Sequence, residues 1–308
     1  MSLYKKCLLC PRLCGADREA GICGHCGETG ELRLAFAGIH RGEEPPVTGT
    51  GGSGTIFVTG CNLGCAFCQN FQISRGMGRS VDTGEFANIC LVLQEKGAEN
   101  INIVTGSHAA PAITAGIAQA RKQGLNIPVL WNSSGYEGMQ TLENLRDFVD
   151  VYLPDLKTMD NKIAAKFFNA PDYPEKAVFA IKKMMEYRKL RFENGIMVSG
   201  VMIRHLVLPG YLESTRQVLS WFSKYCRGSA LLSLMTQYTP VQSPDCIREI
   251  PARYVSGEEY GEILSMLEEF GIDEGYCQEL VTGSEWLPDF TRPNPFSSDL
   301  SLPVWHWL

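Results

Sequence analysis

No stretch of about 20 consecutive apolar residues occurs in this chain of 308 residues, so no membrane-spanning helix is predicted. The first residues, MSLYKKCLLC, also lack the apolar core of a secretory signal peptide. Basic residues are in the minority, with 28 Lys and Arg against 34 Asp and Glu and a formal net charge of −6. A general nucleic-acid binder needs a basic face to neutralise phosphates. The sequence therefore predicts a cytoplasmic protein that acts neither on nucleic acid nor in a membrane.

Cysteine, by contrast, is abundant: the chain has 12, and most of them lie near the N-terminus. In a reducing cytoplasm, clustered thiols favour metal ligation or catalysis over a disulfide framework. Four cysteines are scattered through the rest of the chain, and we interpret them as small packing residues. They are Cys90, Cys226, Cys246 and Cys277.

Six apolar, strand-like runs alternate with segments of helical pattern. The runs are 54–60, 100–105, 127–133, 148–155, 200–208 and 230–238. In the segments between them, such as 83–97, 111–124 and 175–190, apolar residues recur at spacings of three and four. Repeated strand and helix predict an α/β protein with a parallel sheet. Closure into a barrel would cover the apolar strands and remove bare edges, and an open doubly wound sheet is the alternative.

Polar residues gather at the ends of these runs. In a parallel barrel, the loops that follow the strands carry the active site. The polar positions at or just after the six runs are Cys61, Cys65 and Cys68, Thr105 to His108, Asn132 to Tyr136, Asp155 with Lys157, Arg204 with His205, and Gln237 with Tyr238. Because they recur at every run, the sequence predicts a functional site at that end of the barrel.

The first of these loops reads CNLGCAFCQN, residues 61–70, and holds three thiols in a C-x3-C-x2-C pattern. Three thiolates can bind three irons of a cubane iron–sulfur cluster and leave the fourth iron open. A structural zinc site prefers four ligands, so it would need a distant fourth residue. The glycine and asparagines of the loop favour tight turns, which argues against three inert thiols in a packed core.

This loop and five further blocks together resemble the radical S-adenosylmethionine superfamily, and within it the pyruvate formate-lyase activating enzyme-like subfamily. The blocks are EEPPVTGTGGSGTIFVTGCNLGCAFCQNFQIS, NINIVTGSHAAP, NSSGYE, VDVYLPDLK, IRHLVLPG and SLMTQYTP. The resemblance implies a partial (βα)6 TIM-like barrel in which the open iron of a [4Fe-4S] cluster binds S-adenosylmethionine. An electron from the cluster then splits the sulfonium to give a 5′-deoxyadenosyl radical.

We accordingly expect three regions along the chain. A Cys-rich, metal-binding N-terminal extension spans 1–50, and the radical S-adenosylmethionine partial barrel spans 51–274. The last region, 275–308, is Pro-rich and is expected to be an irregular tail that packs over one end of the barrel.

The resemblance also implies which residues contact S-adenosylmethionine or the substrate. One family feature is absent: the Gly-Gly-Glu element after the second strand, where this chain reads VTGSH. Thr105, Ser107, His108 or backbone carbonyls would take its role. GEEPP at 42–46 precedes the first strand and cannot replace that element on sequence position alone. The other implied contacts are Phe67, Asn132, Ser134, Asp155, Lys157, Arg204 and His205.

The N-terminal extension contains five cysteines in a C-x2-C-x3-C-x8-C-x2-C pattern. They are Cys7, Cys10, Cys14, Cys23 and Cys26. The first two and the last two have the spacing of a zinc ribbon. The first four instead fit a second cubane cluster, by resemblance to the motif CxxCPRxC of a related subfamily, and free reduced thiols are the third reading. His25 could also ligate, so the pattern predicts a metal without identifying it.

A deoxyadenosyl radical abstracts hydrogen from C–H bonds held near it, so the protein determines the outcome by positioning the substrate. The resemblance favours abstraction from a backbone glycine of a partner glycyl radical enzyme, with a flavodoxin or ferredoxin as electron donor. Two alternatives stay open. One is a radical enzyme that acts on a small molecule or another peptide, and the other is a non-catalytic protein whose cysteines hold zinc.

Overall fold

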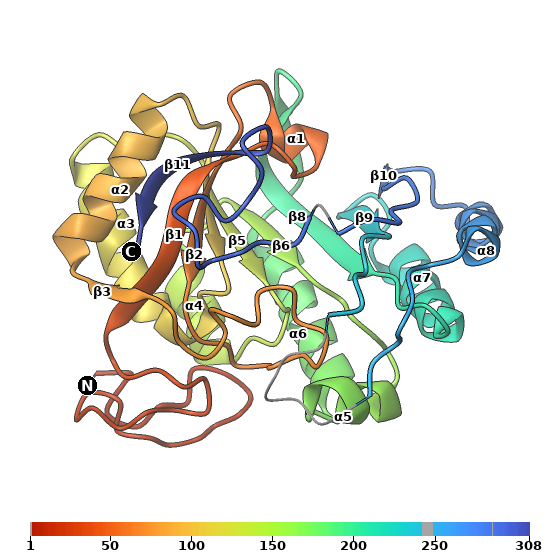
Figure 1. Cartoon of the computed structure of the whole chain (residues 1–308), viewed down its shortest axis with the longest axis horizontal. Helices are drawn as coiled ribbons and strands as arrows, with labels where there is room; N and C mark the ends of the chain where they lie inside the picture. Colours follow the sequence, from red (N-terminus) through yellow and green to blue (C-terminus); the bar gives the residue numbers. More distant parts are fainter. Residues whose placement is uncertain (1, 242–248, 285) are drawn as a thin grey trace.

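The computed structural model describes residues 2–241, 249–284 and 286–308 (Figure 1). Within these residues 11 strands form one sheet, and its barrel part consists of six parallel strands in the order β2-β4-β5-β6-β8-β9, to which one short strand adds in parallel next to β9. The six are β2 (Ser53–Val58), β4 (Ile101–Val104), β5 (Val129–Ser133), β6 (Val151–Pro154), β8 (Ile196–Leu206) and β9 (Leu231–Met235). Each coincides with one of the six predicted runs. The predicted α/β fold with a partial barrel of six parallel strands is therefore confirmed.

Helices cover the outer face of the barrel strands, as Figure 1 shows for α2, α3 and α6. The helices are α1 (Pro45–Thr48), α2 (Thr83–Glu95), α3 (Ala110–Lys122), α4 (Met139–Leu145), α5 (Asn161–Phe168), α6 (Tyr173–Tyr187), α7 (Leu212–Tyr225) and α8 (Gly257–Glu269), with a short 3-10 turn, η1 (Ser107–Ala109). Their apolar stripes pack on the strands because apolar residues recur at three and four spacing. None of the helices in the described ranges is long and apolar enough to cross a membrane.

Five further strands lie outside the six of the barrel; most of them extend the sheet at its two edges, and one pairs with β8. They are β1 (Leu32–His40), β3 (Arg79–Val81), β7 (Arg191–Glu193), β10 (Gly275–Cys277) and β11 (Ser301–His306). The expectation of an irregular tail over 275–308 is wrong for two segments of it, because β10 pairs with β9 and β11 pairs with β1, whereas the described residues between these strands form no helix or strand. β11 accommodates Pro303 because it is an edge strand, where a missing backbone N–H is tolerated.

The scattered cysteines divide between core and surface. Cys90 and Cys226 are fully buried in the main apolar core, so their interpretation as packing residues is confirmed. Cys277 lies exposed on β10, so that interpretation is wrong for this residue, which sits on the short outer strand of the sheet. Cys246 lies outside the described residues.

One end of the barrel interior is closed by apolar side chains. Val47 of α1 packs there with residues from β5, β6 and β8, which are Leu130, Val151, Leu153, Met197 and Met202. Apolar side chains therefore fill this end of the interior. The segment before α1 enters the barrel on the same side and carries Glu43 and Glu44.

Glu259 joins helix α8 to the loop that follows β8. Its carboxylate accepts hydrogen bonds from the backbone N–H groups of Ser256 and Gly210, and Ser256 caps the helix in return. Hydrogen bonds from Arg253, opposed in part by burial, hold the pKa of Glu259 at about 2.

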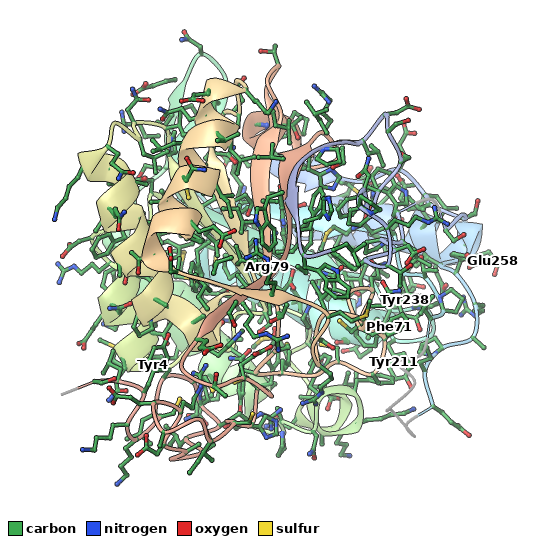
Figure 2. The ribbon with its side chains drawn as sticks, turned by 60° about the vertical axis from the view of Figure 1, so that its left-hand side comes forward. Tyr4, Phe71, Arg79, Tyr211, Tyr238 and Glu258 are labelled. Carbon is green, nitrogen blue, oxygen red and sulfur yellow. The ribbon has the colours of Figure 1, made fainter. Side chains whose placement is uncertain are left out.

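Replacing Glu259 with Gln should lower the free energy of unfolding by about 1 to 2 kcal/mol at neutral pH, since a cap and a charge pair are lost. The folded-state pKa is depressed, so this stabilisation is complete above the unfolded-state pKa of about 4.5 and disappears as the pH falls toward 2. Urea denaturation across that range measures the difference. Glu258→Gln is the control, because Glu258 is exposed on the outer side of the same helix (Figure 2), and an equal effect there would contradict the assignment.

Candidate active site

The three-cysteine loop, residues 61–70, follows β2 directly and lines a cavity of about 260 Å³ at the carboxyl ends of the parallel strands. All three thiols are half-buried and face this cavity. Gly60 and Gly64 have φ angles of 78° and 70°, which a residue with a Cβ adopts only with strain. The Ala66 N–H donates to the Phe167 carbonyl at 2.9 Å, which fastens the loop to the end of α5.

The same loop reaches across to the last barrel strand. Gln69 Nε2 donates to the Gln237 carbonyl at 2.8 Å, and the rings of Phe67 and Tyr238 lie 5.7 Å apart. Phe67 also lines the cavity, as predicted for an aromatic residue near the cofactor. Figure 2 labels Tyr238 and also Phe71, which follows the cysteines.

The thiols of the loop are poor acids in this environment. Burial raises the pKa of Cys68 to about 12, and it raises that of Cys65 as well, although the Lys157 ammonium opposes the shift there. Such thiols ionise only when a metal replaces the proton. In the part of the chain that the structure describes, no three His, Cys, Asp or Glu side chains converge as ligands of a single ion. A cubane cluster does not require convergence, because each thiolate binds a different iron.

A cluster ligated by three thiolates fits this donor set. The cavity is lined by Cys61, Cys65 and Cys68, and none of its other described lining residues is a cysteine. One iron would therefore be open to a ligand inside the same cavity.

Asp155 and Lys157, the predicted pair after β6, both line the cavity and form an ion pair with each other. Burial by itself would lower the pKa of Lys157, but the Asp155 carboxylate and the nearby Cys65 outweigh it and the net pKa is raised. Tyr173 fixes the turn between them, since its hydroxyl donates to the Asp155 carbonyl and accepts from the Lys157 N–H, both at 2.9 Å. Lys157 is therefore a permanently charged donor beside the cysteine loop.

The ends of β4 and β5 supply uncharged polar groups. Asn132 and Ser134 line the cavity, and the buried Ser134 hydroxyl has no hydrogen-bond partner among the described residues. Buried polar groups usually have partners, so this hydroxyl fits a contact to a bound ligand. Thr105 also lines the cavity and has φ of 62°, a strained angle for a β-branched residue.

Three of the predicted contacts lie outside the cavity. Ser107 is buried and donates to Glu137 at 2.8 Å, and the neighbouring His108 is buried in the same turn. His205 makes hydrogen bonds to the Leu156 carbonyl and to Thr215. Side chains alternate along a strand, so Arg204 faces the barrel interior and His205 faces helix α7. Ser107, His108 and His205 therefore do not line the cavity, and their contact with a ligand stays a prediction.

Glu43 is a site residue that the sequence did not identify. It lines the cavity although GEEPP precedes the first barrel strand, and its carboxylate accepts from Asn102 at 3.0 Å and from Arg204 at 2.6 Å. Glu44 lies beside it and also pairs with Arg204. Burial would raise the pKa of Glu44, but the Arg204 guanidinium outweighs it and the pKa is lowered. The only signal in the sequence was two adjacent acidic residues before a Pro-Pro pair.

A second cavity of about 360 Å³ adjoins the first one. The two share Gly42, Glu43, Arg204, Met235 and Gln237. The second is also lined by Glu44, Ser233 and residues 276–278. It therefore extends the site from the cysteine loop toward β10. The opposite rim of the first cavity is aromatic and is lined by His40, Phe57, Trp286 and Phe296.

The five cysteines of the N-terminal extension lie beside the three-cysteine loop. Cys7, Cys10 and Cys26 are buried, whereas Cys14 and Cys23 are exposed. His25, the other residue that could ligate, is exposed as well. The Cys61 N–H donates to the Cys26 carbonyl at 3.2 Å, so the two groups of cysteines are in direct backbone contact.

We predict that Arg204→Met lowers the free energy of unfolding by about 3 to 5 kcal/mol, because it leaves two buried carboxylates without a counter-charge. Adding Glu44→Gln to this variant should restore part of the loss. Urea denaturation measures both effects, with Arg216→Met at the exposed pair with Glu269 as the control. Equal stability of the Arg204 and Arg216 variants would show that Arg204 contributes only to ligand binding.

The comparisons with known proteins agree with this geometry. The family model of the Radical SAM superfamily matches residues 55–222, which is more than half of the chain. Uncharacterized protein MJ0674 of Methanocaldococcus jannaschii is 27% identical over 288 residues, and the match covers 88% of this chain and 77% of that protein.

Two crystal structures of SuiB from Streptococcus suis are similar in fold. The complex with the precursor peptide SuiA has a TM-score of 0.52 and 13% identity over 71% of this chain. The complex with S-adenosylmethionine has a TM-score of 0.51 and 13% identity over 74% of this chain. The matches cover 46% and 49% of SuiB, so this chain spans about half of its length. At this identity the likeness concerns the fold alone.

Proposed function

The chain belongs to the radical S-adenosylmethionine superfamily, and on that premise we propose that it is an activating enzyme that removes a hydrogen atom from a backbone glycine of a partner enzyme. The observation that carries this proposal is the cavity itself. Three thiols, the Asp155–Lys157 pair and the ends of β4 and β5 meet there. Family membership also counts against a non-catalytic zinc protein.

The residues of the cavity fit the cluster and S-adenosylmethionine that the family implies. When bound, these two groups supply an electron and a carbon-centred radical that can abstract hydrogen. Cys61, Cys65 and Cys68 would hold the cluster, and the Ser134 hydroxyl and the Lys157 ammonium are donors for the polar groups of S-adenosylmethionine. Phe67 packs among three aromatic rings, so its face toward the cavity is held rigidly.

The glycine substrate is supported by two features. The blocks DLK at 155–157 and RHLVLPG at 204–210 resemble the glycyl-radical activating subfamily, and the first of them lines the cavity. The adjoining second cavity gives room for a loop of another protein beside the cysteine loop. A flavodoxin or ferredoxin is the proposed electron donor. An acidic chain with net charge −6 is in keeping with a protein substrate rather than a nucleic acid.

A second candidate is hydrogen abstraction from a small molecule or another peptide. The second cavity favours a ligand with a cationic group, because Glu43 and Glu44 carry two negative charges against one positive charge on Arg204. SuiB, which shares the fold, was crystallised with a precursor peptide. In that case the reacting group would enter from the second cavity, and no partner enzyme would be needed.

Cys65→Ala should abolish formation of 5′-deoxyadenosine and remove the iron bound by the loop, because two thiolates cannot hold the cluster. Anaerobic reconstitution, iron counting and chromatography of the nucleoside product measure both effects. Cys90→Ala is the matched control, since Cys90 is buried in the core away from the cavity. A Cys65→Ala protein with full iron and full activity would refute the assignment of the loop.

The glycine assignment is tested by electron paramagnetic resonance of a reaction mixture. Reduced enzyme and S-adenosylmethionine are incubated with a glycyl radical enzyme encoded beside its gene, or with pyruvate formate-lyase where none is. We expect the doublet signal of a glycyl radical, and this signal should narrow when the partner enzyme carries deuterated glycine. The signal should be absent with Cys65→Ala. Formation of 5′-deoxyadenosine without a protein radical would favour the second candidate.

A further inference from the structure

The N-terminal cysteine head, defined as residues 7–26, folds without a helix or a strand. It lies below the carboxyl ends of the barrel strands in Figure 1, and Figure 2 labels Tyr4, which precedes it in the chain. Tight backbone bonds shape it, such as those between Cys7 and residues 15 and 16, both 3.0 Å. Its buried side chains are Cys7, Leu9, Cys10, Arg18 and Cys26. With one aliphatic side chain in its interior, the head has too little apolar surface to hold its shape by burial alone.

Four of the five thiols gather in one place. A methyl group built on Gly24 would lie 3.4 Å from both Cys14 Sγ and Cys26 Sγ, so these two sulfurs flank the same point. Cys7 Sγ accepts from the guanidinium of Arg18 at 3.7 Å, and the Arg18 side chain lies 3.3 Å from the same methyl position on Gly24. Cys10 is buried in the head three residues after Cys7, at the spacing of paired metal ligands. Cys23 is exposed, and among the described residues it takes no part in the contacts around Gly24 and Arg18. The grouping therefore differs from both sets predicted from the spacing, each of which included Cys23.

Arg18 is an independent sign of a negative charge at this place. Its side chain is 1% exposed, and its guanidinium donates to the carbonyls of Glu28, Thr29 and His108 and to Cys7 Sγ at 3.7 Å. Among the described residues, no carboxylate forms an ion pair with it. Burying an unpaired cation is costly. A metal held by four thiolates is anionic, since a divalent ion with four negative ligands has a net charge of −2, and it would supply the missing counter-charge.

We propose that Cys7, Cys10, Cys14 and Cys26 hold one thiolate-bound metal centre, and that this centre braces the three-cysteine loop. Either zinc or an iron–sulfur cluster fits such a ligand set, because both take four thiolate ligands. The four sulfurs lie in the same part of the head but do not point at one common centre. Cys14 is the exposed one of the four and lies on the solvent side of the site. Cys23 is excluded from the ligand set.

The brace acts through Arg12, which lies between Cys10 and Cys14. Its guanidinium donates to the carbonyls of Asn62 and Leu63, at 3.0 and 3.1 Å, inside the three-cysteine loop. It also donates to the carbonyls of residues 168 and 169 at the end of α5, at 2.9 and 2.6 Å. One side chain of the head thus joins the loop to the helix that flanks it. Fixing Cys10 and Cys14 on a metal would fix the turn that carries Arg12.

The second contact of the brace is Cys26. Its carbonyl accepts the N–H of Cys61 at 3.2 Å, next to the first thiol of the loop. Gly60 permits this approach, because a Cβ there would lie 3.0 Å from the Cys26 carbonyl oxygen. The head metal would therefore determine where Cys61 begins the loop. The proposal is separate from the identity of the substrate, since it concerns metal content and loop order alone.

Alkylation of the native, anaerobically reconstituted full chain tests the ligand set without a mutation. Cys14 and Cys23 are both exposed, so they form a matched pair. Iodoacetamide labelling followed by mass spectrometry should leave Cys14 protected and modify Cys23 rapidly. Equal labelling of the two thiols, or protection of Cys23 alone, would overturn the assignment.

Metal counts on the full chain provide the second test. We expect Cys14→Ala to contain one zinc fewer, or about four irons fewer, than the wild type while retaining the iron of the loop. Cys23→Ala should match the wild type. Which metal is lost identifies the centre as zinc or iron–sulfur. Equal loss in both variants, or loss in neither, would refute the four-cysteine site.

The bracing role has its own readout, which a metal count does not provide. Bleaching of the loop cluster by an iron chelator should be at least about tenfold faster in Arg12→Ala, because loss of even one of its four charge-assisted hydrogen bonds has an effect of that size, and it should also be faster in Cys14→Ala. Arg12→Ala should retain the head metal. Arg191→Ala, an exposed arginine on β7, and Cys23→Ala are the controls. Bleaching at the wild-type rate in Arg12→Ala would show that the head does not brace the loop.

Discussion

The candidate site depends on one loop that joins the two sides of an incomplete barrel. β2 and β9 are the first and last of the six parallel strands, and they do not pair with each other. The three-cysteine loop spans that gap, since it leaves β2 and contacts the end of β9 through Gln69 and Phe67. Strand order thus determines where the thiols lie, and the loop in turn closes one wall of the cavity.

Charge is arranged in the barrel interior so that each buried group has an opposite neighbour. Asp155 pairs with Lys157 at the level of the cysteines, and Arg204 pairs with Glu43 and Glu44 below them. Buried pairs contribute little net stability, but loss of one partner is costly. These pairs therefore restrict which side chains are free to bind a ligand. Lys157 keeps donors toward the cavity, whereas most of Arg204 is engaged by the glutamates.

The sequence predicted the six barrel strands because each is a short apolar run, and segments of helical pattern separate the runs. It also predicted the polar ends that line the cavity, such as Asp155 and Asn132. It could not separate Arg204 from His205, because both interrupt one apolar strand and only the register shows which of them faces inward. Phe296 lines the rim of the first cavity, and β11 pairs with β1. Both features depend on contacts between residues that are distant in sequence, and a local sequence pattern cannot predict such contacts.

Glu43 shows why sequence order is a poor guide to the composition of such a site. GEEPP lies outside the parallel strands along the chain, yet the antiparallel β1 returns the segment to the barrel and the Pro-Pro pair starts α1 against β8. The carboxylates then enter the interior from the side and meet Arg204.

The N-terminal head is a second case in which sequence order is a poor guide to the composition of the site. Its contacts with the loop are to backbone carbonyls and to a backbone N–H, not to side chains. Such backbone contacts fix the positions of the thiols, and they do not depend on which side chains lie between the cysteines. An extension that looks like an appendage in the sequence is therefore part of the wall that positions the three cysteines.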